Sequence, residues 1–203
     1  MPYSPERMSR LRRLPDRLRR RIDGIRRLAR VDLESRRERR ARTVVPSAFA
    51  RFGSRSVVLS PVRVVGASSV SIGDDVTIEE GAEIVVADGG TVRIGDRVHL
   101  GPGFVLHCAA AVTIGDDVRA DSHAAVTDGW SGAQQRPPDV VAPPPAQPVV
   151  LERGAHLGRR AVVGPGVTVG HDATVGAGAL LLTDLPAGTT AIGNPAAVVG
   201  DTT

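Results

Sequence analysis

The chain contains the phrase Ser71-Ile72-Gly73-Asp74-Asp75-Val76 and repeats it as Arg-Ile-Gly-Asp-Arg-Val at 93–98 and as Thr-Ile-Gly-Asp-Asp-Val at 113–118. The isoleucines of the three copies are 22 and 20 residues apart, and an aliphatic or small residue recurs every six positions between them. A stricter six-residue period follows an interruption. Its aliphatic positions are Leu151, Leu157, Val163, Val169, Val175 and Leu181.

A period of six fits neither an α-helix nor a plain alternating strand. It fits a short strand followed by a corner, with three such units in each coil. One aliphatic side chain per unit would point into a narrow prism, and each coil would hydrogen-bond to its neighbours about 4.8 Å away. Such a prism leaves little room for rings, and aromatic residues are only 2% of the chain. The pattern therefore predicts a mainly β solenoid, in which each unit packs only on its neighbours.

Charge divides the chain into two parts. Residues 1–45 hold sixteen arginines and six acidic residues, whereas residues 46–203 hold ten arginines and sixteen acidic residues. All 26 basic residues are arginine, so the high pI of 10.7 comes from the N-terminal part. We therefore predict an Arg-rich extension at 1–45 and a solenoid domain at 46–203, whose opening coil shields one end of the prism.

The extension has the pattern of an amphipathic α-helix. Pro15 and Asp16 are typical of a helix start, and apolar residues then share one face with arginines around the other. The face consists of Leu18, Ile22, Ile25 and Leu28. Such a helix could pack on the solenoid or on a second subunit, or attach to an anionic membrane surface. Nucleic acid is disfavoured, because aromatic residues do not alternate with the arginines.

The single cysteine, Cys108, cannot form an intrachain disulfide and indicates a reducing compartment. The apolar runs are too short for a signal peptide or a membrane span. We therefore expect a cytoplasmic protein, with peripheral membrane contact through residues 1–45 as an additional hypothesis.

One histidine departs from the repeat. Aligning the hexads that start at Ile78, Leu100, Ala120, Leu157 and Val175 puts Gly81, Gly103, His123, Arg160 and Gly178 at the same corner. A lone exposed histidine is ordinarily a solvated surface residue. His123 replaces a glycine of the pattern and lies just before the interruption, which favours a functional role. Arg160 would stack beside it, one coil away, as a candidate for binding an anionic group.

The period stops between Thr127 and Pro148. This insertion contains the only tryptophan, Trp130, and six prolines. Long insertions in compact folds are commonly lids, binding loops or disordered segments, and proline-rich chain suits an arm that reaches another subunit. Trp130 is therefore a candidate for contact with a substrate. The remaining histidines are too irregularly spaced for a metal site, and we predict no bound metal.

The motifs of the second half resemble those of the hexapeptide-repeat acyltransferases, in particular sugar and polysaccharide O-acetyltransferases of the maltose/galactoside type. The matching segments are 149–151, 155–158, 164–170, 175–178, 183–186 and 193–196. The resemblance extends over about 52–199. It implies a left-handed parallel β-helix, a homotrimer, and acetyl-CoA bound between neighbouring subunits as acyl donor.

The resemblance also implies roles for individual residues. Asp121-Ser122-His123 matches the family's histidine phrase with its first two residues transposed. His123 would be the general base that removes a proton from a substrate hydroxyl, with Asp121, Trp130 and Arg160 contacting the acceptor. The pantetheine contacts of the family fall on Gly158, Arg159, Gly176 and Ala177, and backbone N–H groups near Arg159 would stabilise the oxyanion.

This sequence departs from the family pattern at five positions: Ala125, His156, Thr183, Ala197 and Gly200. The last three replace basic residues of the family, of which those at 197 and 200 commonly meet the nucleotide phosphates of CoA; Arg153 or the extension could substitute for them. The expected function is acyl-CoA-dependent O-acetylation of a sugar, a glycan or a related small molecule. The alternative is a non-catalytic scaffold that uses the Arg-rich helix for assembly or membrane docking.

Overall fold

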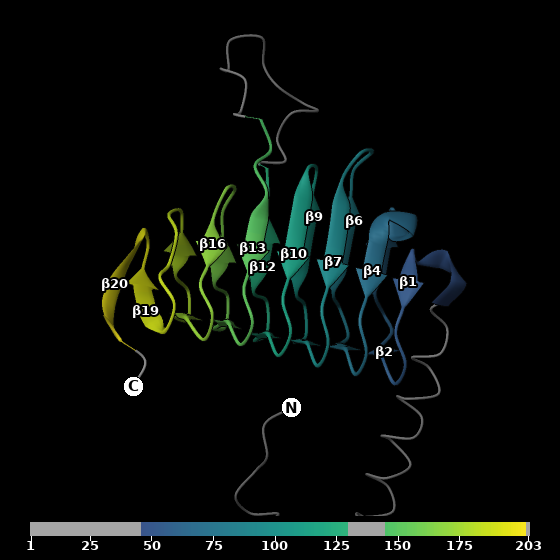
Figure 1. Ribbon diagram of the computed structural model, residues 1–203, viewed down its shortest axis with the longest axis horizontal. Helices are drawn as coiled ribbons and strands as arrows, with labels where there is room; N and C mark the ends of the chain where they lie inside the picture. Colours follow the sequence, from purple (N-terminus) through teal and green to yellow (C-terminus); the bar gives the residue numbers. More distant parts are fainter. Residues whose placement is uncertain (1–45, 130–144, 202–203) are drawn as a thin grey trace, which may run out of the picture. The chain divides into compact units, whose positions relative to one another are not determined.

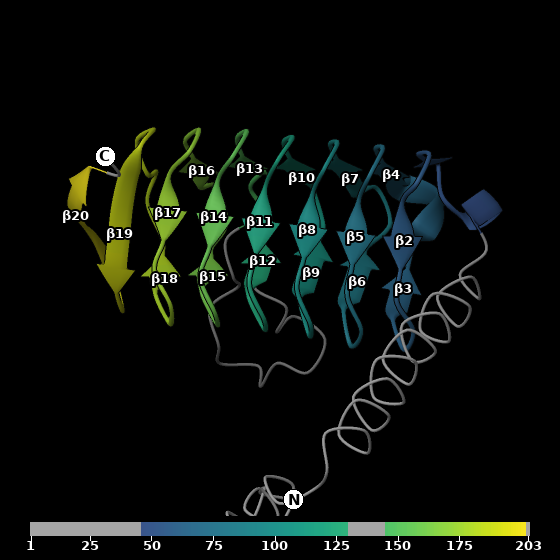
Figure 2. The same ribbon diagram turned by 90° about the horizontal axis from the view of Figure 1, so that it is seen from below.

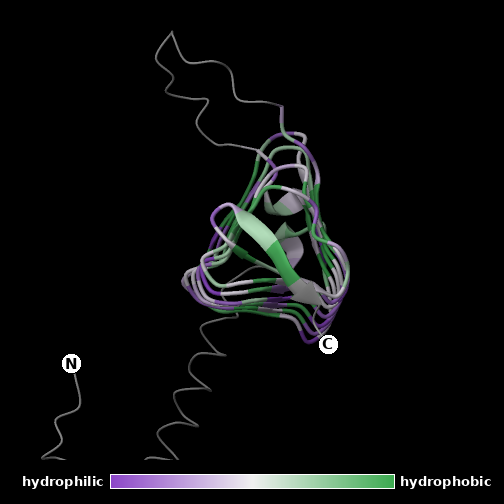
Figure 3. Cartoon of the chain, turned by 90° about the vertical axis from the view of Figure 1, so that its left-hand side faces the viewer, coloured by the Kyte–Doolittle hydropathy of each residue, from purple (hydrophilic) through white to green (hydrophobic). Residues whose placement is uncertain are grey.

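The computed structural model describes residues 46–129 and 145–201. Their strands form three sheets, which are the three faces of a solenoid (Figure 1). Viewed along its axis, the solenoid has a triangular cross-section (Figure 3). The predicted mainly β solenoid is confirmed. The predicted helix at 1–45 lies outside the described residues and stays a prediction, as do the domain boundary after residue 45 and the left-handed sense of the coil.

Three sheets make the faces; six coils each contribute one strand to each sheet, and β19 and β20 extend sheet B. Sheet A consists of β1 (Arg51–Phe52), β4 (Val70–Ile72), β7 (Thr91–Ile94), β10 (Ala111–Ile114), β13 (Val149–Leu151) and β16 (Thr168–Val169). Sheet B consists of β2 (Val57–Val58), β5 (Thr77–Ile78), β8 (His99–Leu100), β11 (Arg119–Ala120), β14 (His156–Leu157), β17 (Thr174–Val175), β19 (Thr189–Gly193) and β20 (Ala196–Asp201). Sheet C consists of β3 (Arg63–Val65), β6 (Glu83–Val86), β9 (Val105–Cys108), β12 (Ala125–Thr127), β15 (Val162–Val163) and β18 (Leu180–Leu181). Sheets B and C are seen side by side from below (Figure 2).

The six-residue period becomes the register of the sheets. In sheet B, Leu100 pairs with Ile78 and with Ala120, and Leu157 pairs with Ala120 and with Val175. All five side chains are buried in the core, as the hexads predicted. The little room for rings that the narrow prism leaves is used by Phe104, whose side chain is fully buried in the core.

The ends of the solenoid differ. A short 3-10 helix, η1 (Pro46–Ala48), precedes the first coil, and the rings of Phe49 and Phe52 lie 5.4 Å apart there. A second 3-10 helix, η2 (Ala67–Ser69), joins β3 to β4. At the other end β20 returns antiparallel on β19. Antiparallel pairing ends the stack, because the next coil of a parallel solenoid cannot continue from it.

The interruption of the period predicted at 127–148 lies between β12 and β13, and its residues 130–144 are outside the described residues. Asp128 anchors its start. This buried carboxylate accepts hydrogen bonds from the backbone N–H groups of Ala109 (2.8 Å) and Ala110 (2.7 Å). The N–H of Gln147 donates to the Asp128 carbonyl at 2.7 Å, so the two ends of the insertion meet at one corner.

Candidate active site

Most of the site residues predicted from the sequence lie on one edge of the solenoid. We call this edge the B–C corner; it consists of the three-residue turns 101–103, 121–123, 158–160 and 176–178, which join sheet B to sheet C in successive coils. The corner brings together Asp121, His123, Gly158, Arg159, Arg160, Gly176 and Ala177. Trp130, the remaining candidate, lies outside the described residues.

The third residue of every turn has a left-handed backbone. The φ angles are 69° at Gly103, 61° at His123, 57° at Arg160 and 69° at Gly178. A residue with a Cβ pays about 1–2 kcal/mol in this conformation, whereas glycine does not. His123 and Arg160 therefore stand where glycine would be more stable.

His123 is exposed at this corner, and its backbone N–H donates to the Pro102 carbonyl at 2.8 Å. Its imidazole leans over the preceding coil: a Cβ built on Gly103 would lie 2.9 Å from the ring Cδ2 and 3.0 Å from Nε2. Gly103 thus makes room for the ring. The imidazole nitrogens form no hydrogen bond with the described residues.

Asp121 is paired with His156, a histidine that the spacing in the sequence did not single out as a site residue. Its Oδ1 lies 3.5 Å from Nε2 of His156 in the next coil. The six-residue register does place His156 beside other basic residues: it pairs with Arg119, and Arg119 pairs with His99. Three basic side chains therefore project from neighbouring strands of sheet B.

Free backbone donors follow the same corner. In each turn the N–H of the third residue is used: Arg160 donates to the Ser122 carbonyl at 3.1 Å, and Gly178 to the Arg159 carbonyl at 2.8 Å. The N–H groups of the middle residues Ser122, Arg159 and Ala177 donate to no acceptor within 46–129 and 145–201. They form a row of donors next to His123.

In coil five (β13–β15) and coil six (β16–β18), counting from the coil of β1–β3, the turn at the B–C corner packs closely on the segment that follows it in the stack. A Cβ on Gly158 would lie 2.7 Å from the Ala177 nitrogen, and one on Gly176 would lie 2.6 Å from the Ile192 side chain. Glycine at both positions lets successive turns approach each other closely, which brings the middle N–H groups into a continuous row.

The other titratable candidates are dispersed. His107 lies on sheet C with its Nε2 3.6 Å from the Glu83 carboxylate, and His171 lies beside Asp172 on another edge. Across the described part of the chain, no group of three His, Cys, Asp or Glu side chains is arranged to hold a metal ion. Burial, with the nearby Asp128 carboxylate as a second cause, raises the pKa of the Cys108 thiol to about 12, which makes it a poor nucleophile near neutral pH.

Known proteins share this architecture. Residues 148–182 match the family model described as the hexapeptide repeat of succinyl-transferase. Residues 148–182 therefore carry the hexapeptide repeat. A 2,3,4,5-tetrahydropyridine-2,6-dicarboxylate N-acetyltransferase of Staphylococcus aureus (strain bovine RF122 / ET3-1) is 42% identical over 60 residues, which are 30% of this chain and 25% of that protein. The chain thus matches about a quarter of the length of this curated relative.

Solved structures share the fold of the hexapeptide-repeat solenoid. AntD, an N-acyltransferase from Bacillus cereus in complex with dTDP and 3-hydroxybutyryl-CoA, has a TM-score of 0.68 at 18% identity, over 77% of this chain and 85% of its own. The hexapeptide-repeat acetyltransferase VCA0836 of Vibrio cholerae, complexed with acetyl-CoA, has a TM-score of 0.52 at 23% identity, over 77% and 73% of the two chains. At these identities the likeness establishes the fold.

Within the described residues, no helix combines the length and the apolar character that crossing a bilayer requires. The cytoplasmic location and the membrane contact through residues 1–45 remain predictions.

Proposed function

We propose that this hexapeptide-repeat protein is an acyl-CoA-dependent acyltransferase whose reaction centre is the B–C corner. The observation that carries the proposal is the exposed His123 imidazole beside a row of backbone N–H groups that have no acceptor among the described residues. A free imidazole and oriented N–H donors are the two elements that acyl transfer from a thioester needs. The S. aureus relative and both neighbours named above are acyl- or acetyltransferases, which supports this choice of chemistry.

The B–C corner also offers a binding site for the acyl donor. The N–H groups of Arg159 and Ala177 suit the carbonyl oxygens of a pantetheine chain, and Gly158 and Gly176 allow close approach of the turns that present them. We assign acetyl-CoA as donor, held by Gly158, Arg159, Gly176 and Ala177. The complexes of AntD with 3-hydroxybutyryl-CoA and of VCA0836 with acetyl-CoA support a CoA thioester.

His123 acts as general base in this proposal. Its imidazole accepts the proton of the acceptor nucleophile while that atom forms a bond to the thioester carbonyl carbon. A corner N–H, that of Ser122 or Arg159, stabilises the negative charge that develops on the carbonyl oxygen. As the carbon–sulfur bond breaks, the imidazolium returns its proton to the departing CoA thiolate, so protons and charge balance.

The acceptor is a hydroxyl of a sugar, glycan or related small molecule, contacted by Asp121, Trp130 and Arg160. An amine is the second candidate, because the S. aureus relative and AntD are N-acyltransferases. Parallel assays with matched hydroxy- and amino-sugars decide between them. Faster turnover of the amino-sugar series would replace O-acylation by N-acylation without changing the role of His123.

A homotrimer is part of the proposal. Sheet C presents an outward row of half-buried apolar side chains directly beyond the His123 turn: Val105, Ala125, Val162 and Leu180, in register in four successive coils. An apolar row of this kind is suited to a subunit contact. Light scattering coupled to size exclusion would give three times the chain mass of 21.2 kDa, and a monomer would contradict it.

The deciding experiment replaces His123 by glycine, the residue that its corner position favours. His123→Gly should leave the stability within about 1 kcal/mol of the parent, retain CoA binding by calorimetry, and reduce acyl transfer by about 10²–10⁴-fold. Release of CoA thiol can report the reaction, since Cys108 is buried. Asp75→Gly is the matched control, at φ 56° on another edge. Absence of CoA binding, or unchanged turnover in His123→Gly, would refute the proposal.

A non-catalytic scaffold that docks on membranes is the alternative function. It is motivated by Thr183, Ala197 and Gly200, which stand where basic residues are usual in the family resembled. Flotation with anionic liposomes, with and without residues 1–45, tests the docking role. CoA-dependent turnover that requires His123 would exclude a purely structural protein.

A further inference from the structure

Sheet B carries a column of basic side chains that the proposed transfer reaction does not use. Its members are His99, Arg119 and His156, which pair with one another in three successive coils. Each side chain precedes a buried residue of a two-residue strand whose burial alternates, so all three project from the outer face of the sheet. Thr77 and Thr174 continue the column on either side.

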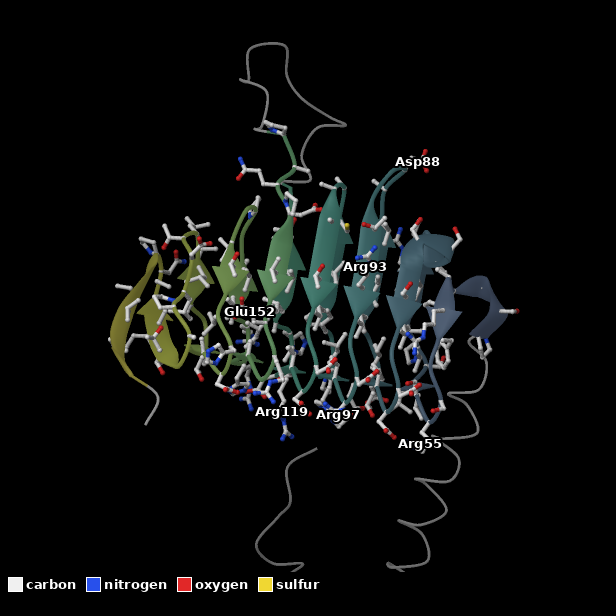
Figure 4. The ribbon with its side chains drawn as sticks, in the orientation of Figure 1. Arg55, Asp88, Arg93, Arg97, Arg119 and Glu152 are labelled. Atoms are coloured by element: carbon white, nitrogen blue, oxygen red, sulfur yellow. The ribbon has the colours of Figure 1, made fainter. Side chains whose placement is uncertain are left out.

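Neighbouring acidic groups do not neutralise the centre of this column. Asp117 is engaged by Arg97, with its Oδ1 2.6 Å from the Arg97 Nε, and Asp121 lies beside His156. The guanidinium of Arg119 forms no ion pair or hydrogen bond with any residue that the structure describes. Figure 4 shows Arg119 projecting from the lower edge of the solenoid, well apart from Arg93 on sheet A.

The column lies beside the reaction centre. Arg119 and His123 belong to the same coil and are four residues apart, so their Cα atoms are separated by at most about 14 Å. His156 and Arg160 have the same separation in the next coil. A single small molecule can therefore contact the outer face of sheet B and present a nucleophile to His123.

We infer that His99, Arg119 and His156 bind an anionic group, a phosphate or a carboxylate, of the acyl acceptor. The guanidinium provides a planar fork of N–H donors that matches either group, and an imidazole on each side can donate a further N–H. This assignment rests on the proposed function for its substrate, because it places the acceptor's anion on sheet B and the donor on the corner N–H groups of coils five and six.

The first test measures binding without turnover. Inorganic pyrophosphate and malonate are titrated into the full chain, and binding is followed by calorimetry and by the ring-proton resonances of His99 and His156. Arg119→Gln should weaken binding about tenfold, and Arg93→Gln, which removes an exposed arginine from sheet A, should not change it. Preference for pyrophosphate indicates a phosphorylated or nucleotide-linked acceptor, and preference for malonate a carboxylate. Equal loss in both variants, or none in Arg119→Gln, overturns the inference.

The second test separates acceptor from donor. With an anionic acceptor, Arg119→Gln should raise the acceptor KM about tenfold and leave kcat and the KM for acetyl-CoA unchanged. A rise in the KM for acetyl-CoA would instead assign the column to the donor phosphates and overturn the inference. Because pyrophosphate and malonate binding needs no transfer, the anion site can be verified even if acyltransferase activity is absent. Transfer that is insensitive to Arg119 would refute this site and leave the proposed function standing.

Discussion

The two edges that flank sheet B are built from the same three-residue turn, yet they use its backbone differently. At the edge between sheets A and B, the A–B corner, the middle N–H groups of the first three coils are capped by carboxylates of the following coil. The hydrogen bonds are Ser54 N–H to Asp74 Oδ1 (2.7 Å), Asp74 N–H to Asp96 Oδ1 (2.8 Å) and Asp96 N–H to Asp116 Oδ1 (2.9 Å). At the B–C corner the N–H groups of Ser122, Arg159 and Ala177 have no such partner in the described ranges.

The difference explains the repeated Ile-Gly-Asp phrase. The isoleucine fills the core, the aspartate caps the preceding coil, and the glycine makes room for the next aspartate. A Cβ on Gly73 would lie 2.4 Å from the Asp96 Oδ1, and one on Gly95 would lie 2.3 Å from the Asp116 Oδ1. In its first three coils the A–B corner thus uses its donors for stability, whereas the middle N–H groups of Asp116 and Arg153 in the next two coils have no acceptor among the described residues. At the B–C corner, the edge that carries His123, the N–H groups of Ser122, Arg159 and Ala177 are not used by any described residue.

The largest expected loss of stability comes from adding a Cβ at a glycine that makes room for a capping aspartate. Gly95→Ala would push its Cβ against the Asp116 carboxylate and against backbone at 2.8 Å, and should reduce the free energy of unfolding by about 2–3 kcal/mol. Gly178→Ala at the B–C corner has open space around the new Cβ and a φ of 69°, so it should cost only about 1 kcal/mol. Denaturant unfolding measures both variants, and equal losses would contradict the contrast.

A proline at position 177 can remove one N–H donor that has no acceptor among the described residues. Pro102 already occupies the middle position of the B–C corner in coil three, so Ala177→Pro should be accommodated. We expect the free energy of unfolding to change by less than about 1 kcal/mol, while the Kd for CoA rises about tenfold through loss of one hydrogen bond. Calorimetry provides the Kd. Unchanged CoA affinity would remove Ala177 from the donor site.

Removing a single cap should have a smaller effect. Asp96→Ala leaves the Asp74 N–H without its acceptor and should lower the free energy of unfolding by about 1 kcal/mol, with Asp96→Asn recovering most of the loss. Asp88→Ala changes an exposed aspartate at the third edge and serves as the control. A cost for Asp88→Ala equal to that for Asp96→Ala would show that charge, and not capping, is responsible.

The smallest effect concerns the exposed ion pairs of the A–B corner. Hydrogen bonds from Arg55 and Arg97 hold the pKa values of Asp75 and Asp117 below their usual range. Because a carboxyl with a lowered native pKa favours the folded state only while it is ionised, this contribution is present above the unfolded pKa of about 3.9 and is lost as the pH falls through the native value.

The double variant Asp75→Asn/Asp117→Asn should therefore show a slightly smaller fall in Tm between neutral pH and about pH 3 than the parent. Calorimetric scans across this range measure the difference. Asp88→Asn, which pairs with no cation among the described residues, should behave like the parent. An identical acid response in all three proteins would show that the pairs add nothing to stability.

The six-residue period alone predicted the sheets, their register and the corner that carries His123, because in a solenoid each residue meets those one coil away. The same arithmetic placed Arg160 next to the His123 turn and the insertion between β12 and β13. Gly158, Arg159, Gly176 and Ala177 were nominated by the family resemblance and not by the period, and they lie on that edge. Because each repeat of a solenoid contacts only its neighbours, the spacing of residues in the sequence determines which residues are adjacent in the structure.

Three features needed the tertiary structure. Asp128 is a buried cap for Ala109 and Ala110, and its sequence neighbours do not disclose the coil whose N–H groups it meets. The register identifies His99, Arg119 and His156 as neighbours, but the absence of any described acidic partner for Arg119 depends on side-chain placement. The finding that N–H groups of the B–C corner have no acceptor among the described residues likewise depends on the folded coordinates. A period fixes which residues are stacked, whereas hydrogen bonds depend on distances and directions that only the folded coils set.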